Sequence, residues 1–410
     1  MGKKIVILFD GTSNEIEEKR TNVLHLYGCL EKSKQQLVFY DPGVGTMASH
    51  QYMYQFMQKT SEVFGLAFGR GIDRNVLEAY RFLVENYQKG DGSNTQRDKI
   101  YLIGFSRGAY SARMLAGFIH NFGLMEPRNL NLLEYVYRAY KRIGENNEKK
   151  DGGSTQRIDA FKEIRMFENV VQPDRPPIKA MGLFDTVSSV FKPSPRRFIQ
   201  RRTHANTNNN ASVQHVRHAA ALHERRRMFR LSEWPKDQTF YTDWRKKEGA
   251  GQQDVAEVWF AGCHADIGGG HSEPNSGLAK IALEWMIKEL GPLGLKFNDT
   301  LVEKLVSGLD PKGTDGKHGH YGGPDAHAKI NDSMGKLWKA LEYVPLPTIR
   351  NTWSGWRRAK EAWREVPEGA TLHASVFARC PDKKDLPPNL PKKYKMIGDM
   401  NDWSDPKGTK

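Results

Sequence analysis

A serine flanked by glycines is the residue whose surroundings most favour chemistry. Ser106 lies in the segment 104–108, GFSRG, which fits the GxSxG pattern of a nucleophile elbow. In that motif the serine occupies a sharp turn between a strand and a helix, and the glycines let the strand and the helix approach closely. An apolar run at Ile100–Phe105 precedes Ser106, and apolar residues at helical spacing follow it. We therefore predict that Ser106 is a nucleophile that attacks carboxylic esters.

A serine nucleophile needs a base, and the base needs a carboxylate that orients it. In sites built on this motif the three residues follow one another in the order serine, aspartate or glutamate, histidine. Asp185 follows the apolar run Ile178–Phe184, and His264 follows the run Val255–Gly262. Both therefore lie at carboxyl ends of predicted strands, where active sites of α/β sheets form. We predict that His264 accepts the proton of Ser106 and that Asp185 orients His264.

Other interpretations of these two residues stay open. Asp185 can be a turn or helix-capping residue, and His264 can be structural. His271 is a rival base. Asp266 is a rival for the orienting carboxylate, although it lies only two residues after His264 and before a run of glycines.

An oxyanion site requires two backbone donors near the nucleophile. The N–H of Arg107, at the start of the predicted helix, is the first candidate. The second is the N–H of Gly11 or Thr12, which follow the predicted strand Ile5–Phe9. A simple β-turn is the alternative there, and Asp10 is expected to hold this loop by hydrogen bonds.

The elements that position these residues are short apolar runs separated by helical patterns. The predicted strands are Ile5–Phe9, Leu37–Tyr40, Ile100–Phe105, Ile178–Phe184 and Val255–Gly262. Strands that alternate with helices predict an α/β-hydrolase-like fold, with a mostly parallel sheet and helices on both faces. We predict a single α/β-hydrolase domain over 1–410, a basic cap-like insertion at 191–251, and a C-terminal extension at 296–410 that packs on the core.

The net charge of the chain is +14, which favours contact with anions. Between Lys192 and Arg230 there are ten Lys or Arg and one acidic residue. This segment is either a functional basic patch or a solvated surface. A second basic segment has Trp353, Trp356 and Trp363 interleaved with Arg357, Arg358, Lys360 and Arg364. It is either a helix at a membrane interface or a helix that packs its tryptophans on the core.

The remaining features of the sequence argue against several classes of protein and of binding site. The three cysteines are odd in number and far apart, which argues against a disulfide framework and for a reducing compartment. No apolar stretch is long enough for a transmembrane helix, and the N-terminus does not fit a signal peptide, so we expect cytoplasmic synthesis. No phosphate-binding loop or complete dinucleotide fingerprint is present. The His-rich loop 315–327 fits a surface loop better than a metal site. We therefore predict no cofactor and no metal.

Taken together, these motifs resemble the Tle1-like family of type VI secretion lipase effectors, also known as an uncharacterised α/β-hydrolase domain family. The matching segments are 9–12 (FDGT), 40–46 (YDPGVGT), 104–113 (GFSRGAYSAR), 184–187 (FDTV), 217–219 (RHA), 259–262 (WFAG), 266–270 (DIGGG) and 373–376 (HASV). The resemblance implies a Ser106–Asp185–His264 triad and activity on lipid or other carboxylic esters. It also implies a secretion-system or immunity partner and export by a type VI secretion system. Larger members carry added membrane-associating or delivery regions.

Two hypotheses for the function are compatible with these features. The first is a serine esterase or lipase of the phospholipase type, with contact to an anionic membrane. The second is a binding protein on a hydrolase scaffold that uses Lys192–Arg230 to recognise anionic lipid or nucleic acid. A complete set of three candidate residues at strand ends favours the enzyme. No nucleic-acid partner is expected.

Overall fold

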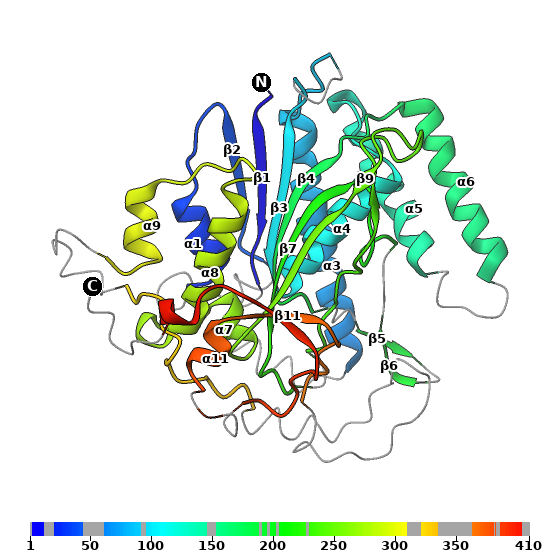
Figure 1. The fold of residues 1–410 in the computed structure, drawn as a ribbon. Coiled ribbons are helices and arrows are strands. Elements are labelled where there is room, and N and C mark those ends of the chain that lie inside the picture. Colours follow the sequence, from blue (N-terminus) through cyan, green and yellow to red (C-terminus); the bar gives the residue numbers. More distant parts are fainter. Residues whose placement is uncertain are drawn as a thin grey trace.

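An eight-stranded sheet forms the centre of the molecule (Figure 1). Its strands lie in the order β12-β11-β10-β7-β4-β3-β1-β2, and every neighbouring pair runs parallel. The strands are β1 (Lys4–Phe9), β2 (Gln36–Asp41), β3 (Lys99–Phe105), β4 (Ile178–Phe184), β7 (Val213–Ala221), β10 (Asp254–Phe260), β11 (Ala370–His373) and β12 (Tyr394–Ile397). The predicted α/β class with a mostly parallel sheet is confirmed.

The computed structural model describes residues 2–11, 20–43, 61–91, 96–145, 153–187, 191–194, 197–201, 205–226, 229–309, 321–334, 363–380, 382 and 386–403. Two small antiparallel ribbons lie outside the main sheet. They are formed by β5 (Phe191–Ser194) with β6 (Arg197–Arg201), and by β8 (Thr239–Phe240) with β9 (Gly251–Gln252). Among the described helices, none is long and apolar enough to cross a membrane.

Helices cover both faces of the sheet. One face packs against α3 (Ser61–Asn86), α4 (Arg107–Asn121), α5 (Leu133–Glu145) and α6 (Gly153–Val171). The other packs against α1 (Asn22–Cys29), α8 (Gly277–Leu290) and α9 (Asp299–Leu305). Shorter helices are α7 (His264–Gly268), α11 (Ser375–Ala378), η1 (Pro127–Leu132), η2 (Glu273–Asn275) and η5 (Met400–Trp403). Two hydrophobic cores result, one on each face of the sheet.

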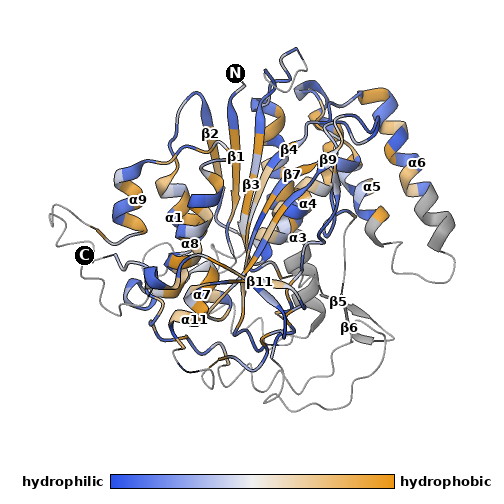
Figure 2. Cartoon of the chain, viewed as in Figure 1, coloured by the Kyte–Doolittle hydropathy of each residue, from blue (hydrophilic) through white to orange (hydrophobic). Residues whose placement is uncertain are grey.

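The sequence of β1 shows why both faces are covered. Successive side chains of a strand point to opposite faces. Ile5, Ile7 and Phe9 lie in the core beneath α3 and α4, whereas Val6 and Leu8 lie in the core beneath α1 and α8. All five side chains are buried. An uninterrupted apolar strand of this kind is typical of a parallel sheet, and Figure 2 shows the apolar strands at the centre of the fold.

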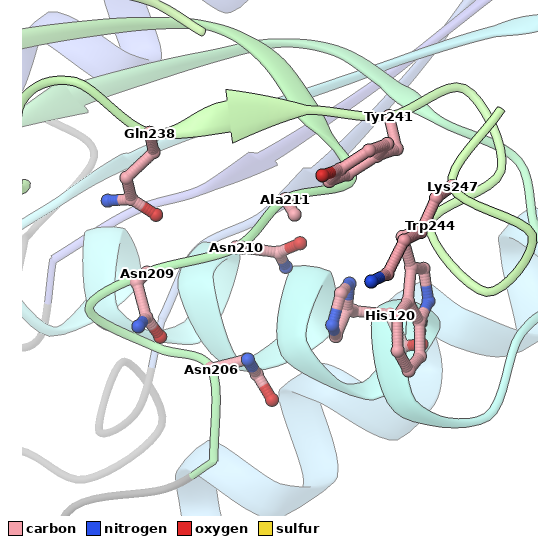
Figure 3. A pocket seen from close by; sticks show the side chains of 9 residues that line it. All are labelled: His120, Asn206, Asn209, Asn210, Ala211, Gln238, Tyr241, Trp244 and Lys247. Atoms are coloured by element: carbon pink, nitrogen blue, oxygen red, sulfur yellow. Dashed lines mark hydrogen bonds between the residues drawn. The ribbon is translucent and has the colours of Figure 1, made fainter. Parts of the chain in front are cut away.

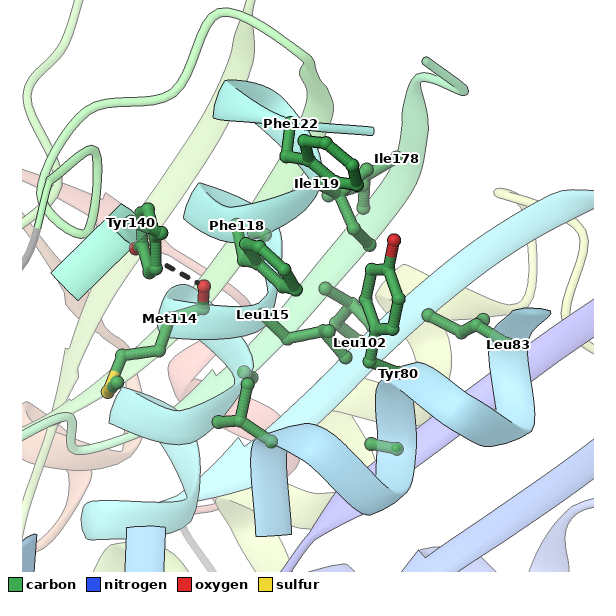
Figure 4. Packing of buried hydrophobic residues seen from close by; sticks show 14 of the residues in the cluster. Tyr80, Leu83, Leu102, Met114, Leu115, Phe118, Ile119, Phe122, Tyr140 and Ile178 are labelled. Atoms are coloured by element: carbon green, nitrogen blue, oxygen red, sulfur yellow. Dashed lines mark hydrogen bonds between the residues drawn. The ribbon is translucent and has the colours of Figure 1, made fainter. Parts of the chain in front are cut away.

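Aromatic packing holds α4 against α3 and the sheet (Figure 4). The rings of Tyr80 on α3 and Phe118 on α4 have centroids 4.8 Å apart. The Tyr80 hydroxyl donates a hydrogen bond of 2.8 Å to the carbonyl of Gly123, just after α4. Leu102 of β3 lies in the same core. These contacts fix the helix that follows Ser106.

The predicted insertion at 191–251 needs correction. Its part Val213–Ala221 is β7, a strand in the middle of the sheet between β4 and β10. Sequence reasoning missed β7 because its polar residues interrupt the apolar pattern. The structure pairs such residues: the Arg217 guanidinium lies 2.7 Å from the Asp254 carboxylate. A strand with partnered polar side chains can therefore occupy a central position.

The predicted C-terminal extension at 296–410 also contributes to the sheet. Within it, β11 pairs with β10, and β12 pairs with β11, so the sheet continues past the last strand predicted from the sequence. Both strands have only four residues, which is too short for a clear periodic signal.

Candidate active site

Ser106 occupies a tight turn between β3 and α4. Its backbone has φ 59° and ψ −119°, a conformation that non-glycine residues rarely adopt. A Cβ added to Gly104 would lie 2.6 Å from the backbone N of Ala109, and one added to Gly108 would lie 2.2 Å from the carbonyl O of Phe9. Both positions therefore require glycine for the strand and helix to approach this closely. This geometry is that of the predicted elbow.

The structure brings Ser106, His264 and Asp185 together. His264 Nε2 lies 2.7 Å from Ser106 Oγ, and His264 Nδ1 lies 2.6 Å from Asp185 Oδ2. With Asp185 ionised, Nδ1–H donates to the carboxylate and Nε2 accepts from the Ser106 hydroxyl. The three residues follow β3, β4 and β10, three strands of one parallel sheet.

The Asp185 carboxylate is fully buried and has four donors. Oδ1 accepts from the backbone N of Ala221 at 2.9 Å and from Arg364 Nη1 at 2.5 Å. Oδ2 accepts from His264 and from Arg364 Nη2, the latter at 3.1 Å. Burial alone would raise the pKa of Asp185, but the Arg364 charge and the His264 hydrogen bond outweigh it and hold the pKa well below its usual range.

The pKa of His264 is lowered, chiefly by burial. The hydrogen bond and the charge of Asp185 act in the opposite direction without cancelling the effect. The imidazole is consequently neutral at neutral pH, which is the state that accepts a proton.

Aromatic rings and an ion pair surround His264. The rings of Phe105 and Phe229 have centroids 4.7 and 4.9 Å from that of the imidazole. The backbone N of His264 donates to the buried Glu224 at 3.1 Å, and Glu224 is in turn bound by Arg226 at 2.8 Å. The imidazole position is thus fixed from its backbone as well as from its ring.

The rival residues have other partners. The Asp266 carboxylate accepts from the backbone N of Cys263 at 2.9 Å and from the Asn331 side-chain amide at 2.6 Å, so it caps α7. His271 Nε2 lies 3.6 Å from Asp266 Oδ1.

The predicted oxyanion donors lie at the end of β1 and at the start of α4. Arg107 is the first residue of α4. The N–H of Gly11 donates to Asp10 Oδ1 at 2.6 Å and is therefore already engaged in this structure. Thr12 lies outside the described residues. As expected, Asp10 holds the loop, since its Oδ2 accepts from the Thr21 hydroxyl at 2.6 Å.

A family model described as the catalytic domain of Tle1-like phospholipase effectors of the type VI secretion system matches residues 3–289. The chain belongs to this family. The match contains the candidate residues Ser106, Asp185 and His264. It ends before β11 and β12.

The similarities to individual proteins are limited in sequence identity or in the share of each chain that they cover. An uncharacterized protein of Saccharomyces cerevisiae, YEL023C, is 30% identical over 237 residues, which are 56% of this chain and 32% of the yeast protein. The chain thus matches about a third of that relative's length. An uncharacterized protein from Pseudomonas aeruginosa has a TM-score of 0.36 and 17% identity, over 72% of this chain and 46% of its own. The Tle1 effector bound to the VgrG spike has a TM-score of 0.32 and 16% identity, over 68% and 53%.

Sequence reasoning did not assign Arg364 to the site of this Tle1-like domain. Its only signal was its place in the basic, tryptophan-rich segment. The structure buries Arg364, whereas Trp363 is half-buried and its ring centroid lies 5.5 Å from the Arg225 guanidinium. Neither residue is in a helix, so the interpretation of this segment as a helix that packs its tryptophans on the core stays a prediction. Residues 353–360 lie outside the described ranges.

Part of the basic segment Lys192–Arg230 is engaged within the protein. Arg217 pairs with Asp254 and Glu289, and Arg226 pairs with Glu224. The side chains of β5 and β6 are not among those described. Within the described residues, no group of three side chains could hold a metal ion, and His318 and His320 of the His-rich loop lie outside them.

Figure 3 shows a pocket, which has a volume of about 240 Å³. It is lined by His120, Asn206, Asn209, Asn210, Ala211, Gln238, Tyr241, Trp244 and Lys247. His120 is at the C-terminal end of α4, whereas Ser106 precedes its first residue. At 1.5 Å per residue the helix separates the two by roughly 20 Å. The pocket is therefore not part of the candidate active site.

Proposed function

We propose that this Tle1-like domain is a serine hydrolase that cleaves carboxylic esters of lipids, with Ser106 as nucleophile, His264 as base and Asp185 as its orienting carboxylate. The observation that carries the proposal is the continuous pair of hydrogen bonds from Ser106 through His264 to Asp185. Family membership supports a lipid ester as the substrate class.

The reaction would proceed in two halves. Ser106 Oγ attacks the ester carbonyl while its proton passes to His264 Nε2. The imidazolium then gives that proton to the leaving alcohol oxygen, and an acyl-serine forms. Water, deprotonated by the same imidazole, then attacks the acyl-serine. The imidazolium returns this proton to Ser106 Oγ as the bond to the acyl carbon breaks, and the carboxylic acid is released. Asp185 stays ionised throughout and stabilises the imidazolium.

The start of α4 supplies the electrostatic part of the proposal. Ser106 stands at the N-terminus of this helix, where the helix dipole favours negative charge. The N–H of Arg107 is the proposed donor to the oxyanion. Because Gly11 is bonded to Asp10, its N–H could serve only after that bond is exchanged, and Thr12 is the remaining candidate from the β1 loop.

The test uses the purified full chain, a fluorophosphonate probe and a p-nitrophenyl ester. Ser106→Ala should abolish labelling and lower hydrolysis by roughly 10⁴–10⁶-fold while the protein stays folded. Ser111→Ala is the matched control, because Ser111 is a buried serine on the next turn of α4 that donates to the Arg107 carbonyl. Full activity in folded Ser106→Ala would refute the proposal.

If hydrolysis depends on Ser106, a panel of phospholipids identifies the ester bond that is cleaved.

The alternative is a binding protein that uses its basic segment for anionic lipid or nucleic acid. Its support is the charge of +14 and the ten basic residues in Lys192–Arg230. Arg217 and Arg226 are already paired with carboxylates, which reduces the charge available for a partner. The probe experiment separates the alternatives, because a binding protein leaves Ser106 unlabelled.

We also propose that the chain travels through a type VI secretion system and contacts its spike, since the family model that matches it is described as the catalytic domain of an effector of that system. Co-precipitation of the full chain with a spike protein from the same cells tests the contact. Failure to bind any spike protein of those cells would contradict it.

A further inference from the structure

One buried arginine joins the C-terminal segment to the candidate active site. Arg364 has a side chain only 6% exposed, and its guanidinium makes two hydrogen bonds to Asp185, one to each carboxylate oxygen. It comes from the segment just before β11, beyond residue 289, where the family match ends. The resemblance that identifies the domain therefore does not include this residue.

The same guanidinium reaches two further groups. Nη1 donates to the carbonyl of Ala221, the last residue of β7, at 3.0 Å. Nη2 donates to the carbonyl of Phe229, whose ring packs edge-on against His264. A planar fork with several fixed donors can hold such an arrangement, whereas a lysine ammonium cannot reproduce it. Arg364 thus links the carboxylate, a strand end and the aromatic wall of the base.

The backbone of Arg364 is anchored as well. Its carbonyl accepts from the Asn389 side-chain amide at 2.9 Å, and the same amide donates to the carbonyl of Leu222 at 3.0 Å. Asn389 lies between β11 and β12, so a residue of the connection between these strands anchors the backbone of Arg364. Arg364 is therefore held in place through its backbone as well as through its side chain.

We propose that Arg364 is a positioning residue of the hydrolase: it fixes the plane of the Asp185 carboxylate and shares its negative charge, and so sets how strongly the Asp185–His264 pair holds a proton. The inference rests on the proposed function for its effect on catalysis. It adds that the catalytic machinery is completed by a segment outside the matched family domain.

The direction of the effect follows from charge. Removing a buried cation lets the Asp185–His264 pair bind its next proton more tightly, whichever atom carries it. The acid limb of the kcat/KM profile should then move to higher pH. Among the described residues, the other charged or titratable groups that face the pair are Arg226 and Glu224, which carry opposite charges, and His218 of β7. His218 Nδ1 lies 2.8 Å from the Glu257 carboxylate. These groups stay in place when Arg364 is changed.

The experiment compares Arg364→Met, Arg364→Gln and Arg364→Lys with the wild type on a p-nitrophenyl ester from pH 4 to 9. The two neutral variants should move the acid limb up by roughly half to one pH unit and lower kcat by up to about 100-fold. Arg364→Lys keeps the charge but loses the fork, so its limb should stay near that of the wild type while kcat falls. Arg379→Met is the matched control, because Arg379 is a half-buried arginine of the C-terminal part that donates to the carbonyl of Ala328.

A second readout does not depend on activity. The His264 imidazole is titrated by NMR in Ser106→Ala, alone and combined with Arg364→Gln, with the signal assigned by its loss in His264→Gln. The combined variant should titrate at higher pH. If no Ser106-dependent hydrolysis exists, the proposed function fails while this titration still decides the inference. An unmoved titration and acid limb in folded neutral variants, or loss of folding in all three Arg364 variants, would overturn the proposed role.

Discussion

At the scale of single residues, the candidate site is a set of side chains whose environments differ sharply. Asp185 is held ionised by the Arg364 charge against the effect of its burial, and His264 is held neutral by burial. Pairs of titratable groups whose pKa values are pushed apart are typical of acid–base sites. Two predictions follow at this scale.

The assignment of the base is tested by comparing two histidines. His264→Ala should lower ester hydrolysis nearly as much as Ser106→Ala, by roughly 10⁴–10⁶-fold, because the hydroxyl loses its proton acceptor. His271→Ala should leave the rate within about twofold, because His271 lies beside Asp266 instead. Steady-state rates on one soluble ester measure both. The opposite ranking would make His271 the base.

The lowered pKa of His264 predicts the pH dependence. An unperturbed histidine titrates near about pH 6.5. Because burial lowers the pKa of His264, the imidazole stays neutral down to a lower pH. The midpoint of the acid limb of kcat/KM should therefore lie below pH 6.5. The stability of the fold should also decrease at acid pH. As pH falls below about 6.5, His264 binds a proton in the unfolded chain but not in the folded protein, so the free energy of unfolding decreases. An acid limb above pH 7 would contradict this prediction.

At the scale of elements, the sequence predicted the strands that carry the site but not all the strands that complete the sheet. Ser106, Asp185 and His264 follow β3, β4 and β10, whose apolar runs are long enough to recognise. In contrast, β7 has polar side chains, among them Arg217 and His218, between its valines and alanines, and only the structure supplies their partners. Arg364 could not be found from spacing, because the contact with Asp185 joins residues 179 positions apart.

The close approach of α4 to β1 yields a prediction for the elbow. Gly108→Ala would place a Cβ 2.2 Å from the carbonyl O of Phe9, a backbone atom that cannot rotate away. The helix must shift, which should cost about 1–3 kcal/mol and displace Ser106. Gly251→Ala is the control, because nothing lies within 4 Å of a Cβ there. The midpoint temperature of thermal unfolding and the rate of ester hydrolysis should both be lower for Gly108→Ala and unchanged for Gly251→Ala. Equal values for the two variants would refute the argument.

At the scale of the whole molecule, the charge of +14 predicts how the proposed hydrolase contacts a lipid surface. Each basic residue near an anionic membrane contributes about 1 kcal/mol of attraction, and salt at about 0.1 M screens it beyond roughly 10 Å. Hydrolysis should therefore be faster on vesicles containing phosphatidylglycerol than on neutral vesicles, and the difference should shrink in high salt. A soluble ester serves as the control. Equal, salt-independent rates on both vesicles would leave the basic segment only a structural role.

The spacing of the site residues along the chain has a consequence for the time at which the proposed hydrolase becomes active. The groups proposed to act together are spread along the chain at residues 106, 185, 264 and 364, and the last belongs to the segment leading into β11. A ribosome adds about 5–20 residues per second, so Arg364 follows His264 by roughly 5–20 s. Under the proposed role of Arg364, the nascent chain holds its nucleophile and base before the carboxylate is clamped. Under this proposal, full hydrolytic competence would arrive only after Arg364 has been made, which shortens the period in which an incomplete hydrolase could attack the lipids of the cell that makes it.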